Sequence, residues 1–178
     1  MDFSTGNWRV REAVAEDVPD ILQMIKDLAV YEKEPASVVK VTEEELLRDG
    51  FGESPLFNCL IAEVIQTPEE DHCLPKKRAI GFALYFNYYS TWEGRTLFLE
   101  DLFVDPTSRG KGIGKALLKR VSAIAVERKC TRLDWHVLYW NKLALDFYDR
   151  IGAVCMDEWR LYRLSGKRLL QFADKKLE

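Results

Sequence analysis

Three glycines recur at two-residue intervals in one short segment, which runs Arg109, Gly110, Lys111, Gly112, Ile113, Gly114 and Lys115. Glycines let backbone amides approach an anion closely, and a helix that begins here directs its unpaired N–H groups and the positive end of its dipole to the same point. The three cationic side chains of the segment would add charge for a pyrophosphate or a ribose phosphate. The segment therefore predicts a phosphate-binding loop; the simpler alternative is a glycine-rich turn that caps a helix.

Two common phosphate motifs do not fit this loop. A P-loop requires the pattern G-x-x-x-x-G-K-[ST], and no glycine of the chain is followed by Lys-Ser or Lys-Thr at that spacing. A dinucleotide fingerprint requires G-x-G-x-x-G, and its last position is occupied by Lys115 instead of glycine. Both classes of nucleotide site are therefore excluded for this segment.

Two adjacent carboxylates, Glu100 and Asp101, interrupt an apolar run over residues 96–104. In a regular strand neighbouring side chains point to opposite faces, so one of the two acids should face an otherwise apolar side of the sheet. A carboxylate there is costly unless it is paired or used for chemistry. The pair is a candidate for proton transfer, and the alternative is a carboxylate that backbone donors of the sheet satisfy.

Apolar patterning predicts the elements that must position these residues. Alternating or continuous apolar runs predict strands over 8–14, 57–64, 79–88, 96–104, 131–138 and 159–164. Apolar residues at three- and four-residue steps predict helices from Asp17 to about Tyr31, over 113–128, and over 141–151, the last ended by Gly152.

Two shorter features complete the pattern. A capping box of Thr42 and Glu45 predicts a short helix through Arg48, stopped by Gly50 and Gly52. The polar stretch 66–78 is expected to be a hairpin loop, and the charged tail after residue 164 is a candidate for a short helix. This order of elements predicts an α+β, or mixed α/β, architecture with a central sheet, folded as one domain over residues 1–178.

Composition bounds the partners and the compartment. The net charge of −3 gives no general attraction to nucleic acid or to an anionic membrane surface. The four cysteines form no C-x-x-C motif, and His72 and His136 are too few and too far apart to indicate a metal site. The first seven residues are polar and no apolar run approaches membrane-spanning length, so we expect a cytoplasmic protein with reduced thiols.

The glycine segment, placed after a strand that ends at Val104 and before a long helix, resembles the acetyl-CoA signature of the GNAT superfamily. Residues 140–141 and 147–153, which include Trp140, Asn141 and Tyr148, are similar to the second conserved segment of that superfamily. The resemblance extends from about Arg9 to Leu164. Within the superfamily the chain resembles the diamine acetyltransferases, the group of spermidine/spermine N1-acetyltransferase and thialysine N-epsilon-acetyltransferase, through residues 31–32, 49–52, 59–63, 89–92 and 99–104.

This resemblance implies a GNAT-like central sheet of six to seven mostly antiparallel strands flanked by helices. It implies an acetyl-CoA-dependent N-acetyltransferase that acts by direct transfer on a primary amine of a small cationic substrate, without a metal. It also implies a homodimer with channels formed partly between subunits. The alternatives are a protein lysine or N-terminal acetyltransferase, and a catalytically silent module that binds coenzyme A.

The resemblance assigns the chemistry to two side chains. Glu100 matches the position that binds the amine and relays its proton, since an amine with a pKa of about 10 must be deprotonated to react. Tyr148 matches the general acid that protonates the departing thiolate, and its alternative is a core aromatic residue beside Leu145 and Ile151.

The resemblance also assigns binding roles. The main chain of Leu102, Phe103 and Val104 is expected to hydrogen-bond the pantetheine arm and the acetyl carbonyl. Asn141 matches a position that contacts the coenzyme, although a helix-capping role alone explains an asparagine there. The positions that line the amine channel are Tyr31, Glu32 and Trp92.

Two departures from the family bear on the substrate. Ser90 stands where the polyamine enzymes carry an aspartate two residues before the tryptophan, so an anchor for a second ammonium group is missing. The acidic loop of the family is shorter here, and Asp157 or Glu158 is its only replacement. Both differences favour thialysine or a related lysine analogue over a polyamine such as spermidine.

Overall fold

The computed structural model describes residues 4–5, 7–65 and 78–174. The chain divides into two compact units, Met1–Leu138 and Tyr139–Glu178, which are described separately. The expected single domain over residues 1–178 stays a prediction.

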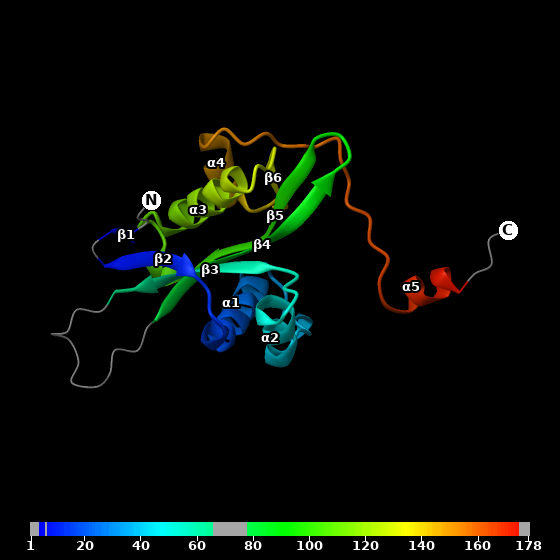
Figure 1. The fold of residues 1–178 in the computed structure, drawn as a ribbon, viewed down its shortest axis with the longest axis horizontal. Coiled ribbons are helices and arrows are strands. Elements are labelled where there is room, and N and C mark those ends of the chain that lie inside the picture. Colours follow the sequence, from blue (N-terminus) through cyan, green and yellow to red (C-terminus); the bar gives the residue numbers. More distant parts are fainter. Residues whose placement is uncertain (1–3, 6, 66–77, 175–178) are drawn as a thin grey trace. The chain divides into compact units, whose positions relative to one another are not determined.

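The first unit is built on a six-stranded sheet in which the strand order follows the chain (Figure 1). The strands are β1 (Ser4–Thr5), β2 (Trp8–Glu12), β3 (Asn58–Val64), β4 (Ala79–Ser90), β5 (Gly94–Val104) and β6 (Leu133–Trp135). Neighbours from β1 to β5 pair antiparallel, and β6 pairs parallel to β5. The mixed α/β class and the mostly antiparallel sheet are therefore confirmed.

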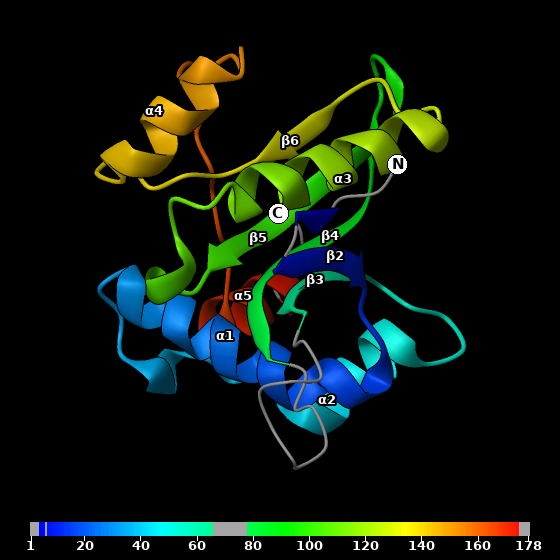
Figure 2. The same ribbon diagram turned by 90° about the vertical axis from the view of Figure 1, so that its left-hand side faces the viewer.

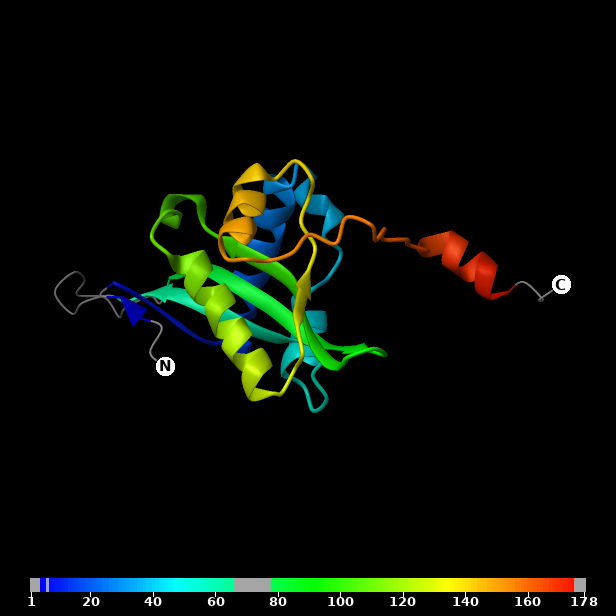
Figure 3. The ribbon, with the colours of Figure 1, turned by 90° about the horizontal axis from the view of Figure 1, so that it is seen from above.

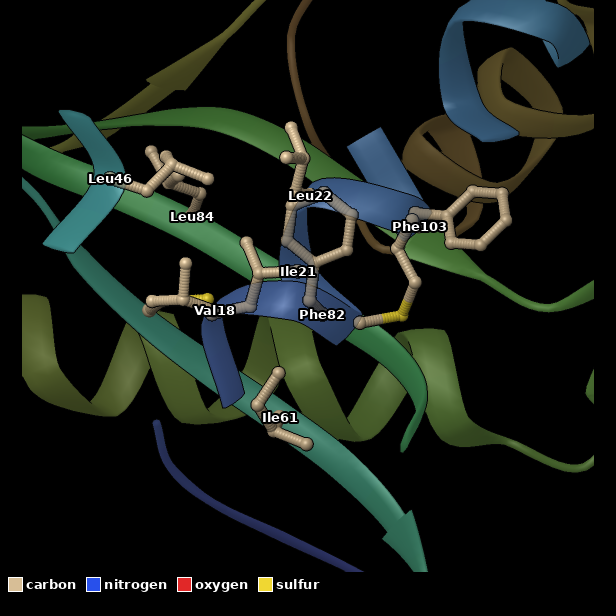
Figure 4. Packing of buried hydrophobic residues seen from close by; sticks show 10 residues of the cluster. Val18, Ile21, Leu22, Leu46, Ile61, Phe82, Leu84 and Phe103 are labelled. Atoms are coloured by element: carbon tan, nitrogen blue, oxygen red, sulfur yellow. The ribbon is translucent and has the colours of Figure 1, made fainter. Parts of the chain in front are cut away.

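Helices cover both faces of this sheet (Figure 2). Helices α1 (Val18–Tyr31) and α2 (Glu43–Phe51) lie on one side, and α3 (Ile113–Glu127) lies across the strands on the other (Figure 3). The core between α1, α2 and the sheet contains Val18, Ile21, Leu22, Met24, Leu46, Cys59, Ile61, Phe82, Leu84 and Phe103 (Figure 4). Helix α1 contributes positions 18, 21, 22 and 24 to it; the first three follow the predicted helical spacing, and Met24 was not part of the predicted stripe.

The start of α1 is fixed by a network of ion pairs. Arg11 binds both Asp17, which precedes α1, and Glu63 on β3, and Arg9 binds Glu63 as well. Burial acts to raise the pKa of the Glu63 carboxyl, but hydrogen bonds from Arg11 and Arg9 outweigh it and hold the pKa below its ordinary value. The network joins β2, β3 and α1, and it anchors the helix whose far end reaches Tyr31.

Helix α2 begins as predicted and ends later than predicted. The Thr42 side chain accepts a hydrogen bond from the Glu45 backbone, and the Glu45 carboxylate accepts one from the Thr42 backbone. The expected stop at Arg48 is wrong, because the helix continues through Gly50 to Phe51. A Cβ atom at Gly50 would lie 2.4 Å from the ring of Phe57, so this glycine permits a close approach inside the helix.

Strand β5 contains one extra residue relative to β4. Leu84 pairs with Asp101, whereas the next residue, Tyr85, pairs with Leu99, so Glu100 is the extra residue of a β-bulge. Paired residues share a face of the sheet, which places Asp101 with Leu84 on the α1 side. The regular alternation expected for Glu100 and Asp101 is therefore interrupted at this point.

The second unit contains α4 (Lys142–Arg150) and α5 (Gly166–Ala173). Gly152, with a φ of 83°, follows α4 as expected, and the short helix in the charged tail is confirmed. The predicted strand over 159–164 is wrong: among the described residues of this unit there is no strand to pair with. In the first unit the predicted strand over 131–138 shortens to β6, and most of the predicted hairpin loop over 66–78 lies outside the described residues.

Candidate active site

The glycine segment forms a turn that leads from the end of β5 into α3. Gly110 and Gly112 have φ angles of 78° and 82°, in the left-handed region that favours glycine. A Cβ atom at either position would meet nothing within 4 Å, so the backbone conformation, and not lack of space, requires glycine here. Gly112 is the N-cap of α3, and the first intrahelical hydrogen bond runs from the Ala116 amide to the Gly112 carbonyl at 3.0 Å.

The amides of Ile113, Gly114 and Lys115 therefore precede the first intrahelical hydrogen bond and are available to an anion. The positive end of the α3 dipole lies at the same place. Lys111 and Lys115 are exposed, so their side chains are accessible to a bound phosphate. The backbone and the charges of this turn fit the pyrophosphate of a coenzyme.

Arg109 has a different environment from the two lysines of the loop. Its Nε donates a hydrogen bond to the Val104 carbonyl at 3.0 Å. Its guanidinium carbon lies 4.5 Å from the ring centroid of Tyr31 and 6.0 Å from that of Phe103. The side chain thus connects the loop to the end of β5 and to the last residue of α1.

The outer edge of β5 changes along the strand. Its ladder with β4 continues to Val104, whereas its ladder with β6 covers only Leu97 to Leu99. Past Leu99 the backbone of β5 follows an edge of the sheet, where main-chain groups can bind an extended ligand. Residues 102–104, the segment expected to bind the pantetheine arm, lie in this part of the strand.

Three carboxylates gather around the bulge and the end of α1. Glu100 is exposed, while Asp101 is half-buried. Burial, followed by the charges of Glu100 and Glu32, raises the pKa of Asp101 from its ordinary 3.8 to about 7. Burial also raises the pKa of Glu32, which follows the last residue of α1. Among the described residues no cation forms a salt bridge with any of these three acids.

Asp101 had no role of its own in the sequence analysis, because the family resemblance assigned the proton relay to Glu100. Alternation indicated that one of the two adjacent acids would be buried, but it gave no means of choosing between them. The choice depends on the bulge, and a bulge formed by Glu100 has no mark in the sequence, because no glycine or proline signals it.

The structure does not bring Trp92 to the other predicted amine-site residues. Trp92 lies in the turn between β4 and β5, is 83% exposed, and precedes the start of β5 at Gly94. At about 3.3 Å per residue, the strand carries Asp101 roughly 23 Å away from Gly94. Ser90 is buried at this turn, where its Oγ accepts hydrogen bonds from the Trp92 and Glu93 amides, both at 3.2 Å.

Tyr148 and Asn141 both belong to the second unit. Asn141 caps α4, since its Oδ1 accepts a hydrogen bond from the Ala144 amide at 3.3 Å. Tyr148 lies on the same helix, with its ring centroid 5.3 Å from that of Phe147, and burial raises the pKa of its phenol. Asp157 and Glu158, the replacements for the acidic loop, are exposed.

Comparison with known proteins gives matches over nearly the whole chain. Residues 30–153 match the Acetyltransferase (GNAT) family. Thialysine N-epsilon-acetyltransferase of Bos taurus is 41% identical over 171 residues, which cover 93% of this chain and 97% of that protein. Spermidine/spermine N(1)-acetyltransferase-like protein 1 of Homo sapiens is 39% identical over 177 residues, which cover 97% of this chain and 24% of that protein.

Among solved structures, an integron cassette protein from the mobile metagenome of V. cholerae superimposes with a TM-score of 0.72 and 25% identity. The match covers 96% of this chain and 100% of that one. The integron cassette protein and this chain therefore have the same fold.

The sheet, the glycine turn and the open amides of α3 define a transferase that uses an acyl-coenzyme A. The chain belongs to the acetyltransferase (GNAT) family. It is an acetyl-CoA-dependent N-acetyltransferase, with acetyl-CoA as its co-substrate. Within the described residues no group of three or more His, Cys, Asp or Glu side chains is placed to hold a metal ion, and no helix is both long and apolar enough to cross a membrane.

Proposed function

We propose that this enzyme acetylates a primary amine of a small cationic substrate, and that thialysine or a related lysine analogue is a better acceptor than spermidine or spermine. The observation that carries the proposal is the group of three carboxylates, Glu32, Glu100 and Asp101, beside the end of β5. Burial, and then repulsion by Glu100 and Glu32, raises the pKa of Asp101, and an ammonium group would relieve the repulsion. A neutral or anionic acceptor would leave that repulsion in place.

Glu100 and Asp101 share the handling of the acceptor's proton in this proposal. Glu100, exposed in the bulge, binds the incoming ammonium and relays its proton. Asp101 has a pKa of about 7, which suits a group that must take up a proton near neutral pH and release it again. The alternative, in which backbone donors satisfy the buried acid, gains no support from the hydrogen bonds of the described residues.

The coenzyme side is formed mainly by main chain. Acetyl-CoA supplies the acetyl thioester. The amides at the start of α3 and the cations Lys111 and Lys115 hold its pyrophosphate, and the β5 edge at residues 102–104 holds the pantetheine arm. The Asn141 side chain contributes to coenzyme binding, and Tyr148 protonates the leaving thiolate.

The preference for a smaller amine rests on Ser90 and on the relatives. The Ser90 hydroxyl is engaged in the β4–β5 turn, and it offers no carboxylate for a second ammonium group. The bovine relative of 41% identity is named a thialysine N-epsilon-acetyltransferase, and so are relatives from Sus scrofa and Mus musculus at 42% and 41% identity. A ring such as Tyr31 and one acid at Glu32 suit the side chain of a lysine analogue.

We also propose a homodimer in the cytoplasm. Trp92 can line an amine channel with Tyr31 and Glu32 only if a second copy supplies it, because the two groups lie at opposite ends of β5. The second unit exposes a run of large apolar side chains that a second copy could cover: Val154, Met156, Trp159, Leu161, Tyr162, Leu164, Leu169, Leu170 and Phe172. The free thiols of Cys59, Cys130 and Cys155 fit a reducing compartment.

The test is a steady-state screen of acceptors at fixed acetyl-CoA, following the release of thiol. Thialysine, lysine, ornithine, putrescine, spermidine, spermine and a basic peptide are compared by kcat/KM. We expect thialysine to exceed spermidine and spermine by at least tenfold. Transfer to the peptide alone would indicate a protein acetyltransferase, and coenzyme A binding without transfer to any acceptor would indicate a silent binding module.

A further inference from the structure

The Arg109 side chain contacts residues of two different elements. Nε donates to the Val104 carbonyl, the guanidinium lies 4.5 Å from the Tyr31 ring centroid, and the Phe103 ring is 6.0 Å away. These partners come from the end of β5 and from the last turn of α1. The side chain therefore spans two elements that are distant in sequence.

This geometry gives Arg109 contacts that a cation bound only to phosphate would not need. A guanidinium that binds a phosphate presents two parallel N–H groups to it in one plane. The Nε of Arg109 is bonded to Val104 and one face of the guanidinium covers Tyr31, so the fork formed by Nε is occupied, while the Nη1–Nη2 edge is left available to a phosphate. Lys111 and Lys115 are exposed, and among the described contacts neither side chain bonds to a carbonyl or packs on an aromatic ring as Arg109 does.

We propose that Arg109 is a positioning residue that couples the coenzyme loop to the acceptor end of α1. Its bond to the Val104 carbonyl fixes the edge of β5 from which the loop departs. Its stacking on Tyr31 fixes the last turn of α1 and thus the carboxylate of Glu32, the next residue. The assignment of the two sides to coenzyme and amine rests on the proposed function.

The coupling has a consequence for kinetics. A phosphate ligand acts on the coenzyme alone, so its removal should raise the KM for acetyl-CoA and leave the acceptor unaffected. A residue that holds both the loop and Tyr31 should, when changed, raise the KM for the amine as well. A small misplacement of either side costs rate, because transfer depends on the alignment of the two reactants.

Two donors separate these possibilities. Acetyl-CoA carries the pyrophosphate, and acetylpantetheine lacks it. Arg109→Lys keeps the charge but loses Nε and the planar stack, so we expect its kcat/KM to fall about tenfold with both donors. Arg120→Lys, on the outer part of α3 and paired with Glu127, is the matched control and should behave as wild type with both donors. A defect with acetyl-CoA that disappears with acetylpantetheine would overturn the proposal.

A binding measurement provides a readout independent of turnover. The Kd of coenzyme A, measured by calorimetry at low and high salt, should rise a few fold in Arg109→Lys while its dependence on salt stays as in wild type. Lys111→Met should instead weaken this salt dependence, because it removes a charge next to the phosphate. A salt dependence reduced in Arg109→Met to the level of Lys111→Met would assign Arg109 to the phosphate and reject the positioning role.

The Tyr31 partner tests the coupling directly. Tyr31→Leu removes the ring, and the double variant with Arg109→Lys should bind coenzyme A no more weakly than the weaker single variant. Tyr31→Phe keeps the ring and should preserve the effect of Arg109→Lys. If the effects of Tyr31→Leu and Arg109→Lys on the Kd of coenzyme A simply add in the double variant, the two residues are not coupled and the proposal is wrong. Wild-type protein that binds coenzyme A but acetylates no amine would instead reject the proposed function, and the binding cycle would still report on Arg109.

Discussion

The two ends of strand β5 differ in what they hold. At the carboxyl end, Asp101 is half-buried beside Glu32, Arg109 lies on Tyr31, and the glycine turn leads into α3. At the amino end, the turn after β4 exposes Trp92, and its one buried polar side chain, Ser90, is bonded to backbone amides of the turn. Both ends contain residues of the predicted site, and both gather ionisable groups. At the amino end Glu93 and Asp134 each form a salt bridge with Arg132, whereas at the carboxyl end Glu32, Glu100 and Asp101 form none with the described residues.

In the proposed function, one chain holds a reaction centre at the carboxyl end of β5 and a remote part of the substrate channel at the hairpin. Groups that act on the reacting atoms must lie within a few ångströms of one another, and the bulge and the two positive-φ glycines arrange them at one place. A residue that only lines a channel can stand on an exposed turn and serve a neighbouring subunit. Changes at the carboxyl end should therefore affect turnover most, and changes at the hairpin should affect only the acceptor.

The largest effect is expected for Asp101→Asn. Loss of a group that accepts a proton should lower kcat/KM about 100-fold. The wild-type rate should rise with pH through the pKa of about 7, as Asp101 ionises, and this rise should be absent in the variant. A pH profile of kcat/KM for the amine, recorded for wild type and variant, measures both the loss of rate and the loss of its pH dependence. If Glu100→Gln loses the rate and Asp101→Asn keeps both the rate and the pH dependence, Glu100 acts without Asp101.

Tyr148→Phe should have the next largest effect. The substitution keeps the ring and the packing on Phe147 but removes the proton donor, so kcat should fall by about tenfold or more. The melting temperature checks that the fold is retained. A kcat close to that of wild type would remove Tyr148 from the general-acid role and leave the carboxyl end of β5 as the sole source of proton transfer.

Gly112→Ala and Gly94→Ala compare the two ends under equal strain. The two glycines have φ angles of 82° and 90°, and each has open space where a Cβ would stand. Each substitution should cost about 1–2 kcal/mol of stability, because alanine disfavours this region. Only Gly112→Ala should also raise the Kd of coenzyme A, by about fivefold, since it shifts the amides at the start of α3. Calorimetric titration of both variants with coenzyme A measures this difference. An equal loss of affinity for coenzyme A in the two variants would contradict the assignment of the coenzyme to α3.

Trp92→Ala should have a smaller effect, confined to the acceptor. We expect the KM for the amine to rise about threefold, as for the loss of one aromatic contact to a cation, while the KM for acetyl-CoA stays within error. Sedimentation equilibrium of the same samples establishes the number of copies. A monomer with an unchanged amine KM would separate the hairpin from the site altogether.

The smallest expected effect concerns stability and pH. Because the pKa of Asp101 is raised from 3.8 to about 7 in the fold, the unfolded chain loses this proton first, and stability falls as pH rises through that window. Asp101→Asn removes this loss. Its melting temperature should exceed that of wild type by a few degrees at pH 8, and the difference should shrink toward pH 4. A difference that does not change with pH would show that Asp101 is ionised normally in the fold.

Much of the fold followed from local signals in the sequence. The capping box of Thr42 and Glu45, the apolar stripe of α1 and the glycines before α3 are short-range features, and the structure has all of them at or near the predicted residues. The conformation of the glycine turn was predictable for the same reason, because it depends on glycine and on the helix that follows. The helix signals and the glycine turn both depend on residues that are close together in the chain.

The features that were missed depend on partners distant in the chain. The bulge at Glu100 is defined only against β4, and it decides which acid is buried. The assignment of Arg109 to the phosphate stays a prediction, and its contact with the Tyr31 ring could not be inferred from its neighbours in the loop. Gly50 was taken for a helix stop because its close approach to Phe57 cannot be inferred from either residue alone.

The bulge in β5 lets the strand hold one residue more than its pairing with β4 uses. Deletion of Glu100 would leave Leu99 paired with Tyr85 and Asp101 with Leu84, so no side chain of β5 would change face. Regular pairing that kept Glu100 would instead put Glu100 opposite Leu84 and turn over every side chain after it. Asp101 and Phe103 would then exchange faces with Leu102 and Val104, so the bulge decides which of the two adjacent acids faces α1.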